Sequence, residues 1–489
     1  QEKKNKLLET YLSYTKNVEA INTNVDLVGG YAYQNFHKFE PYAPTFNGNN
    51  VPPPVGYDIN TRKVLLSFYG RGIFTIANRY ILSVSARRDG SSLFWNGVDR
   101  KNLWGTFPGV SVAWKINEEG FLKGKGINTL KLRAGWGKTG NQEVDYASSY
   151  PAFSSYGLSN GGAQYYLGDQ FYQMYRPNIY NPNLTWETTT TKNLGLDYGF
   201  AKNRIFGSID VFQKNLENSR VGLLVDQNIA AGDVSNHNLL NAGTMDTQGI
   251  EGSITVIPVK NENTTWELSF NATHYDSKIT NLVSGADDSF NIQVGAISGG
   301  VGNLIQAHVV GRQPYAFYVY QQVYDNAGKP LDGVFVDRNG DGKINASDKY
   351  YYKSTQPDAI LGFNTKFTHR NWDAGLSARA VIGNYVYNNA ASNSSLQSGS
   401  TNEYLQNVYN TAPINGFATP QYFSDIFVEN ASFFRLDNVN VGYNFRDVFS
   451  PGSSLRVYGM AQNVLVITKY TGVDPEVFGG IDNGYYQMP

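Results

Sequence analysis

The stretch KNLGLDYGF at Lys192–Phe200 decides the fold class of this chain. Its apolar and aromatic residues fall at every second position, namely at Leu194, Leu196, Tyr198 and Phe200. The positions between them carry Asn193, Gly195 and Asp197. A period of two places successive side chains on opposite faces of an extended strand, whereas a helix needs a period near 3.6. The stretch therefore predicts a β-strand with one apolar face and one polar face.

The same alternation recurs along the chain in roughly fifteen segments of about ten residues each. Clear examples cover residues 79–89, 130–136, 265–273 and 438–445. Strands of globular proteins are usually about five to six residues long, while a tilted strand that crosses a membrane needs about ten. The segment length therefore favours a transmembrane β-barrel over a soluble sandwich, although strands of a sandwich also alternate.

Two further patterns favour the membrane barrel. Aromatic residues stand near the expected strand ends, where barrels carry interfacial girdles: Phe107, Trp114, Trp136, Trp186, Trp266 and Trp372. Short connections are expected at 77–79, 201–204, 260–264 and 370–371, and long ones at about 38–62, 143–187, 218–245, 278–313, 325–358 and 385–430. Outer-membrane barrels have short periplasmic turns and long extracellular loops. We therefore predict an all-β fold, a transmembrane antiparallel β-barrel with long extracellular loops.

Composition excludes several classes of function. The 489 residues carry 40 Lys and Arg against 41 Asp and Glu, so the formal net charge is −1 and no nucleic acid partner is expected. The chain has no Cys, which excludes disulfides, thiolate nucleophiles and zinc ribbons. No apolar run is long enough for a helical membrane span. Only residues 1–16 and 402–411 have a pattern that also suits a helix, and the first suits a strand equally well.

Six longer motifs point to one family. Three lie in the first half of the chain: RRDGSS at Arg87–Ser92, LKLRAGWGKTGNQ at Leu130–Gln142 and NPNLTWETTTTKNLGLDYGF at Asn181–Phe200. The others are DRNGDGKINASD at Asp337–Asp348, ENASFFRLDNVNVGYNF at Glu429–Phe445 and VYGMAQNVLVITKYTGVDPE at Val457–Glu476. Together they resemble the TonB-dependent outer-membrane transporters of the SusC/RagA type, from Bacteroidetes-like Gram-negative bacteria.

The resemblance implies a barrel of roughly 22 strands closed around a plug. It implies that residues 1–489 form about 15 of those strands, the C-terminal part of one such barrel, with the plug, the first strands and the last strand outside this chain. An open sheet edge in lipid leaves unpaired backbone groups, each costing several kcal/mol. We therefore expect this chain to be a fragment of a larger protein. The expected partners are a SusD-like surface lipoprotein, the TonB complex through the absent segments, and membrane lipid.

The motif DRNGDGKINASD has the ligand spacing of an EF-hand-like calcium loop. Hard oxygen ligands at this spacing can wrap a calcium ion, and Gly342 permits the sharp bend. The oxygen ligands would come from Asp337, Asn339, Asp341, the Lys343 carbonyl, Asn345 and Asp348. A bidentate Glu is usual where Asp348 stands, so its shorter arm weakens or reshapes the site. The alternative is a loop whose side chains only cap their own backbone in Asx-turns.

Motifs for catalysis are absent or fail. GWGKTG at Gly135–Gly140 lacks the first glycine of a phosphate-binding loop and continues a strand. GVSVA at Gly109–Ala113 is one residue short of a nucleophile elbow. The five histidines are scattered: His37, His237, His274, His308 and His369. No enzymatic activity and no required cofactor are therefore expected.

Loop aromatics are the best candidates for ligand binding. Flat aromatic faces beside amides and charged groups suit a sugar ring or an extended peptide. The candidate contact residues are Tyr165, Tyr166, Tyr172, Tyr175, Arg176, Tyr387 and Asn388. The alternative is that these residues pack loop against loop or against a partner.

Two classes of function remain open. The resemblance implies TonB-dependent import of an oligosaccharide or oligopeptide across the cell outer membrane. The alternative is a soluble or surface β-rich protein that binds glycans or mediates adhesion without transport, with the aromatics as core and binding surface. A passive porin is disfavoured by the resemblance. The sequence does not distinguish a glycan from a peptide substrate.

Overall fold

The computed structural model describes residues 2–41, 59–143, 152–154, 156–158, 164–177, 180–224, 237–283, 290–299, 302–393 and 415–484. Most of these residues lie in strands, and helix is limited to short pieces such as α1 (Asn389–Asn393). The ambiguous N-terminal segment is strand β1 (Glu2–Val18), while 402–411 lies outside the described residues. No helix in the described ranges is long and apolar enough to cross a membrane. The all-β expectation is confirmed.

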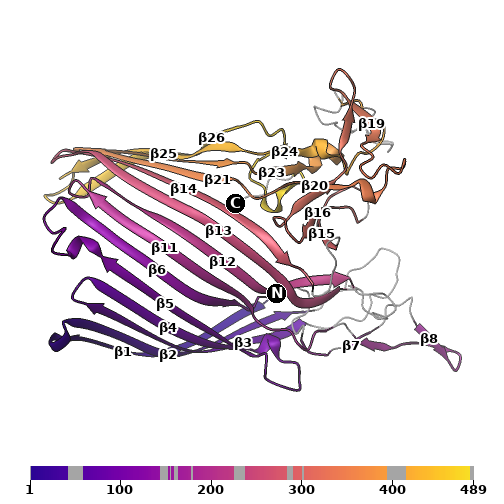
Figure 1. Ribbon diagram of the computed structural model, residues 1–489, viewed down its shortest axis with the longest axis horizontal. Coiled ribbons are helices and arrows are strands. Elements are labelled where there is room, and N and C mark those ends of the chain that lie inside the picture. The colour runs from indigo at the N-terminus through magenta and orange to yellow at the C-terminus, as the bar shows by residue number, and fades with distance from the viewer. Residues whose placement is uncertain are drawn as a thin grey trace. The chain divides into compact units, whose positions relative to one another are not determined.

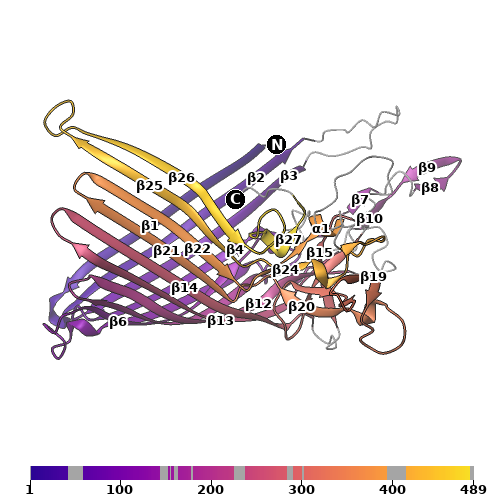
Figure 2. The same cartoon turned by 90° about the horizontal axis from the view of Figure 1, so that it is seen from above.

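Fourteen strands of the described chain form one antiparallel sheet, with each strand bonded to the next long strand along the sequence (Figures 1 and 2). This up-and-down order is typical of outer-membrane barrels. The strands are β1, β2 (Thr23–Glu40), β3 (Ile59–Ile76), β4 (Tyr80–Ser91), β5 (Trp104–Lys115), β6 (Ile127–Asn141), β11 (Glu187–Phe200), β12 (Ile205–Leu224), β13 (His237–Lys260), β14 (Thr264–Asn281), β21 (Ala359–His369), β22 (Trp372–Ile382), β25 (Phe433–Arg446) and β26 (Ser454–Thr468).

Shorter strands lie in the long connections. Between β6 and β11 they are β7 (Tyr156–Leu158), β8 (Gln164–Leu167), β9 (Gln170–Gln173) and β10 (Tyr175–Pro177). Between β14 and β21 they are β15 (Asn291–Ala296), β16 (Leu304–Val309), β17 (Ala316–Val319), β18 (Gln322–Tyr324), β19 (Pro330–Phe335) and β20 (Tyr350–Ser354). The remaining ones are β23 (Tyr385–Asn388), β24 (Val428–Asn430) and β27 (Ile481–Asp482).

The chain divides into two compact units. Unit 1 comprises residues 1–123, 131–194 and 213–245, and unit 2 comprises residues 124–130, 195–212 and 246–489.

In unit 2, strand register sorts the side chains by polarity. Strands β14, β21, β22 and β25 pair in that order, and residues directly opposite one another share a face of the sheet. One row across the four strands is apolar: Trp266, Phe367, Ala374 and Val441. The next row is polar or glycine: Glu267, Lys366, Gly375 and Asn440. We call the two resulting surfaces the apolar face and the polar face.

Large side chains on the apolar face of unit 2 are exposed. Phe270 and Val441 are each 47% exposed, and Trp372 is 53% exposed. In unit 1, Leu194 of the stretch that opened the sequence analysis is 55% exposed. A soluble sandwich would bury such a face in its core, whereas extensive exposed apolar surface marks contact with a membrane or a partner. The expectation that the apolar residues face lipid is therefore supported over the soluble alternative.

Unit 1 contains a small core that corrects part of the aromatic-girdle expectation. Phe107 and Trp186 are buried, and their rings meet edge-on with centroids 5.3 Å apart. The Trp186 indole also donates a hydrogen bond to the Leu103 carbonyl at 3.0 Å. The expectation is wrong for these two residues because the turn Ser92–Phe94 folds back and packs Phe94 on Trp186. The exposed members of the expected girdle are Trp114, Trp136, Trp266 and Trp372.

Several strands are longer than the sequence pattern predicted. Strand β12 has 20 residues and β13 has 24, against the roughly ten that a membrane crossing needs. The expected long connection at 218–245 is therefore too long, because β12 continues to Leu224 and β13 already begins at His237. Beyond the membrane both faces of a strand contact water, so its residues no longer alternate in polarity. Backbone pairing continues there, and the sequence pattern therefore underestimates the strand length. The expected short turns at 77–79, 201–204 and 370–371 are confirmed.

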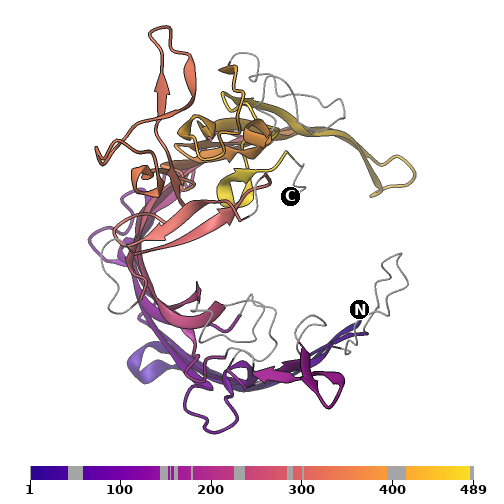
Figure 3. The ribbon, with the colours of Figure 1, turned by 90° about the vertical axis from the view of Figure 1, so that its right-hand side faces the viewer.

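The expected connections at 278–313 and 325–358 are one continuous excursion between β14 and β21, in unit 2. The residues between them form β17 and β18 and do not add a strand to the large sheet. The excursion gathers at the end of the sheet opposite the 370–371 turn, and the last described residues, in yellow, lie at the same end (Figures 2 and 3). This excursion and the segments around β23, β24 and β27 share the largest buried core, which includes Phe317, Phe417 and Tyr387.

Candidate functional site

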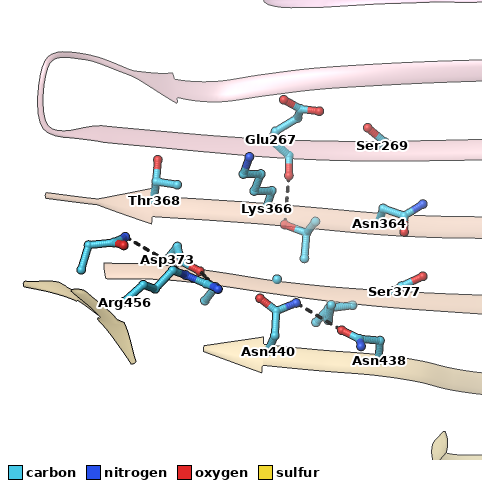
Figure 4. Close-up of a pocket in the computed structure, with 15 residues that line it drawn as sticks. Glu267, Ser269, Asn364, Lys366, Thr368, Asp373, Ser377, Asn438, Asn440 and Arg456 are labelled. Carbon is cyan, nitrogen blue, oxygen red and sulfur yellow. Dashed lines mark hydrogen bonds and ion pairs between the residues drawn. The ribbon is translucent and has the colours of Figure 1, made fainter. Parts of the chain in front are cut away.

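The polar face of unit 2 carries a cavity of about 640 Å³ (Figure 4). It is formed by β14, β21, β22, β25 and β26, whose polar side chains point to the same side of the sheet. The labelled lining residues are Glu267, Ser269, Asn364, Lys366, Thr368, Asp373, Ser377, Asn438, Asn440 and Arg456. Amide, hydroxyl and charged groups at this density bind water or a hydrophilic ligand. In this part of the sheet, a hydrated polar face therefore lies on the side opposite the apolar face.

An ion pair fixes one end of the cavity. The Arg456 guanidinium donates to both carboxylate oxygens of Asp373, at 3.0 Å through Nε and 2.6 Å through Nη2. The Asn444 amide adds a third hydrogen bond to Asp373 at 3.3 Å. Gly442 makes room for this pair, since a Cβ there would lie 2.8 Å from Arg456 Nη2. Bidentate Arg–carboxylate geometry is directional as well as charged, so it holds both side chains in place.

The sequence pattern alone does not predict the residues of this cavity. Each of its labelled side chains belongs to the polar half of an alternating strand, and strand alternation gives no information about which strands become neighbours. Pairing of β22 with β25 brings Asp373 opposite Gly442, and the 383–432 connection separates these two strands in the sequence. The sequence did indicate which positions of each strand are polar. It did not indicate which of those polar residues line the cavity.

Three of the expected ligand-contact tyrosines lie on an exposed hairpin of unit 1, formed by β8 and β9. Tyr165 pairs with Tyr172 and Tyr166 pairs with Phe171 across the hairpin. Gly168 and Asp169 both have positive φ, of 56° and 64°, which suits a tight two-residue turn. The structure thus brings Tyr165, Tyr166 and Tyr172 together on one hairpin, with Tyr175 two residues after β9.

The aromatic rings of this hairpin present a broad, accessible surface. Exposed fractions are 57% for Tyr165, 59% for Tyr166 and 64% for Tyr175. The Tyr166 hydroxyl donates to Asp169 at 3.0 Å, and its ring lies 4.9 Å from the Phe171 ring, centroid to centroid. The expected contact residue Arg176 lies in β10, and its side chain is outside the described residues. Exposed rings beside amides and a carboxylate are chemically suited to a sugar or a peptide.

The other expected contact residues, Tyr387 and Asn388, lie elsewhere. Both are completely buried in unit 2, in the core of the excursion. The Tyr387 hydroxyl donates to the Tyr422 carbonyl, and Asn388 donates to Glu429 at 3.0 Å and to Thr471 at 3.1 Å. Assigning them to ligand contact was therefore wrong, because their polar atoms are used to join loop segments.

The loop Asp337–Asp348 uses its carboxylates on its own backbone. Asp337 accepts hydrogen bonds from the amides of Gly340 and Gly342 at 2.7 and 2.8 Å. Asp348 is fully buried, and the backbone N–H of Asn345, followed by that of Arg338, lowers the pKa of its carboxyl below the usual range. The other expected ligands make the same kind of contact: Asn339 accepts from Asp341, Asp341 from Lys343, and Asn345 from Ser347. These are the Asx-turn contacts of the alternative interpretation.

No group of three or more His, Cys, Asp or Glu side chains converges on a possible metal position within the described residues. Lys349, which directly follows Asp348, holds the end of this loop against the neighbouring segment that contains Phe423. Its ammonium lies 3.4 Å from the centroid of the Phe423 ring, and burial lowers the pKa of Lys349 to about 8. Calcium binding by the loop stays a prediction.

The fold and the two faces define a class of protein, an outer-membrane β-barrel built from antiparallel strands. The family model for the TonB dependent receptor-like β-barrel matches residues 4–304. The chain belongs to this family, whose members are receptors and transporters rather than enzymes, and its location is the outer membrane.

Individual relatives agree with this assignment. The chain is 38% identical to TonB-dependent receptor SusC of Bacteroides thetaiotaomicron, over 99% of this chain and 49% of that protein. It is 30% identical to TonB-dependent receptor P3 of Formosa agariphila, over 98% of this chain and 49% of that protein. The solved structure of the RagAB peptide transporter matches with a TM-score of 0.77 at 20% identity, over 99% of this chain and 54% of that one. The chain spans about half the length of these relatives.

Proposed function

We propose that the complete protein imports an oligosaccharide or an oligopeptide across the outer membrane in a TonB-dependent manner. The observation that carries this proposal is the cavity of about 640 Å³ on the polar face, behind an apolar face suited to lipid. A polar wall of this kind suits a path for hydrophilic cargo. The relatives named for TonB dependence and for peptide transport support the same activity.

The proposed partners are inferred from the similarity to SusC and to the RagAB transporter. A SusD-like lipoprotein would cover the extracellular end, and TonB would act through segments outside this chain. The exposed tyrosines of the β8–β9 hairpin are the proposed ligand contacts, and the chain's own residues bind and orient cargo without bond-making chemistry. The soluble glycan-binding alternative receives no support from the exposed apolar face.

The hairpin proposal has a direct test in the complete receptor with its partner lipoprotein. We expect the triple variant Tyr165→Ala, Tyr172→Ala, Tyr175→Ala to weaken cargo binding by about tenfold or more, a loss of about 1.4 kcal/mol, because stacking and hydrogen bonding are removed together. Binding would be measured by calorimetry with oligosaccharide and oligopeptide mixtures, and uptake by growth on the same cargo. Tyr324→Ala is the matched control, since Tyr324 is 48% exposed but lies outside the hairpin. Unchanged binding and growth in the triple variant would remove the hairpin from the site.

Calcium at residues 337–348 remains a prediction with its own measurement. Titration of the complete receptor with calcium should release heat and protect the loop from proteolysis, because the carboxylates would exchange backbone contacts for a bound cation. The variant Asp337→Asn, Asp341→Asn should lose both responses while keeping the loop's amide-accepting oxygens. A titration without heat and without protection would leave only the Asx-turn interpretation.

A further inference from the structure

Two arginines on the polar face of unit 2 lie directly beyond the cavity of that face, toward the extracellular end. Arg379 of β22 is in phase with Ser377, which lines the cavity, and lies two residues, or about 7 Å, further along the strand. Arg435 of β25 pairs directly opposite Arg379. Because β22 begins after the short 370–371 turn, its far end is the extracellular one, and a molecule that enters from outside passes these arginines before it reaches the cavity.

Two cations at directly opposite positions repel each other, so this pair requires nearby carboxylates. A β-bulge supplies the first of them. Strand β25 carries one extra residue, Asp437, at the point where its register with β22 shifts. The Asp437 carboxylate lies 3.4 Å from the Nε atom of Arg379. The bulge thus directs an acidic side chain at one of the two arginines.

The segment after β26 supplies two more carboxylates, and we call its residues 469–482 the strap. Asp474 accepts a hydrogen bond from Nη2 of Arg435 at 2.6 Å, and Glu476 accepts one from Nη2 of Arg379 at 2.7 Å. Glu476 also lies 3.8 Å from Nη2 of Arg435. The strap ends in β27, which pairs in parallel with β23 and so fixes the segment to the rest of unit 2. Both carboxylates are therefore held against the polar face.

The two hydrogen-bonded ion pairs differ in accessibility. The Arg435 side chain is only 10% exposed, so its pair with Asp474 is an anchor for the strap. The side chains of Arg379 and Glu476 are 41% and 46% exposed, so their pair is accessible from solvent. Three carboxylates against two guanidiniums leave this charged cluster with a net charge of −1. A cation that approaches the exposed pair is therefore favoured over an anion.

We propose that the Arg379–Glu476 pair is a specificity-determining contact for cargo, which selects cargo that carries an ammonium group over cargo that carries a carboxylate. This inference rests on the proposed import function and adds the charge class of the cargo. Entering cargo reaches the pair before the cavity, and the strap orders both side chains before cargo arrives. An ammonium group binds the remaining lone pairs of Glu476, whereas a carboxylate meets an excess of negative charge.

The proposal can be tested by uptake through the complete receptor with its partner lipoprotein. The probes are size-matched oligopeptides and oligosaccharides, each in a cationic, a neutral and an anionic form, and the readout is the ratio of cationic to anionic uptake. The class of probe that shows this ratio identifies a peptide or an amino sugar as the source of the ammonium group.

Two variants should shift the ratio in opposite directions. Glu476→Gln changes the cluster charge from −1 to 0, and the ratio should fall about fivefold, the effect of one unit charge at about 8 Å in water on a cation relative to an anion. Arg379→Gln changes the cluster charge to −2, and the ratio should rise by a similar factor. Both shifts should shrink at higher ionic strength, because salt screens exposed charges. A purely structural role of the pair would give no such salt dependence.

Glu262→Gln and Arg370→Gln are the matched controls. They make the same two charge changes at the short turns 261–263 and 370–371, where both residues are exposed, and should keep the wild-type ratio. Uptake of a neutral probe with the wild-type ratio in both Glu476→Gln and Arg379→Gln would overturn this inference and leave the proposed function standing. Absence of uptake of every probe by the wild-type protein would contradict the proposed function and this inference with it. Glu476→Gln keeps an amide oxygen that can accept from Arg379, so it suffices if Arg379→Gln fails to fold.

Discussion

Val441→Arg should destabilise the folded receptor in a bilayer by about 2–4 kcal/mol, the cost of a charged side chain on the lipid face near the centre of a membrane barrel. Val441 is 47% exposed and lies in a row with Ala374 on the apolar face. The free energy of unfolding would be measured by reversible urea titration in lipid vesicles. The effect is large because the residues directly across from Val441, namely Ala374 of β22 and Gly459 of β26, can neither solvate the guanidinium nor pair with it.

The neighbouring substitution Asn440→Arg is the matched control. Asn440 lies on the polar face opposite Gly375 and Met460, so its side chain has no charged residue directly across either neighbouring strand. A new cation there stays in water, and we expect a change of less than about 1 kcal/mol, as is usual for substitutions at hydrated positions. An equal loss of unfolding free energy in Val441→Arg and Asn440→Arg would contradict the assignment of Val441 to a lipid-facing side and Asn440 to a water-facing side.

Tyr387→Ala should destabilise the excursion of unit 2 by about 3–5 kcal/mol, the usual cost of removing a large aromatic side chain from a packed core. Tyr387 is fully buried, and its ring contacts Phe427 edge-on with centroids 6.1 Å apart. Hydrogen exchange of β16 and β17 in the complete receptor would report the local loss of protection.

Tyr387→Phe separates the ring from the hydroxyl. It keeps the ring but removes the hydroxyl that donates to the Tyr422 carbonyl and that forms a hydrogen bond with the Ser392 side chain, so we expect a smaller cost of about 1–3 kcal/mol. Wild-type protection in Tyr387→Ala would contradict the burial of this residue and would return it to the candidates for ligand contact.

Face polarity was the part of the fold that the sequence predicted best. At 265–273 and 438–445 every residue lies on the face that its position in the alternation assigns, because a one-residue shift of register would turn an entire strand over. The short turns were predictable for a related reason, since they interrupt two such segments with only a few polar residues.

The excursion and the buried aromatics could not be predicted in this way. Tyr387 and Trp186 have the same local sequence character as exposed aromatics, and only contacts with residues distant in sequence, such as Tyr422 and Leu103, bury them. The polar cavity was missed for the same reason, since Asp373 and Arg456 are brought together by strand pairing across 83 residues. Local alternation determines which face a residue occupies, and long-range pairing determines its neighbours there.

The central claim is that the apolar phase of each strand contacts lipid while the polar phase contacts water. This chain has no Cys, so a single cysteine placed at each position from 438 to 445 is unique within it. Each can be spin-labelled in the complete receptor in bilayers, after replacement of any Cys outside this chain. The account predicts that collisions with lipid-soluble oxygen peak at 439, 441, 443 and 445, and that collisions with a water-soluble nickel chelate peak at 438, 440, 442 and 444. The opposite phase, or accessibility without a period of two, would contradict it.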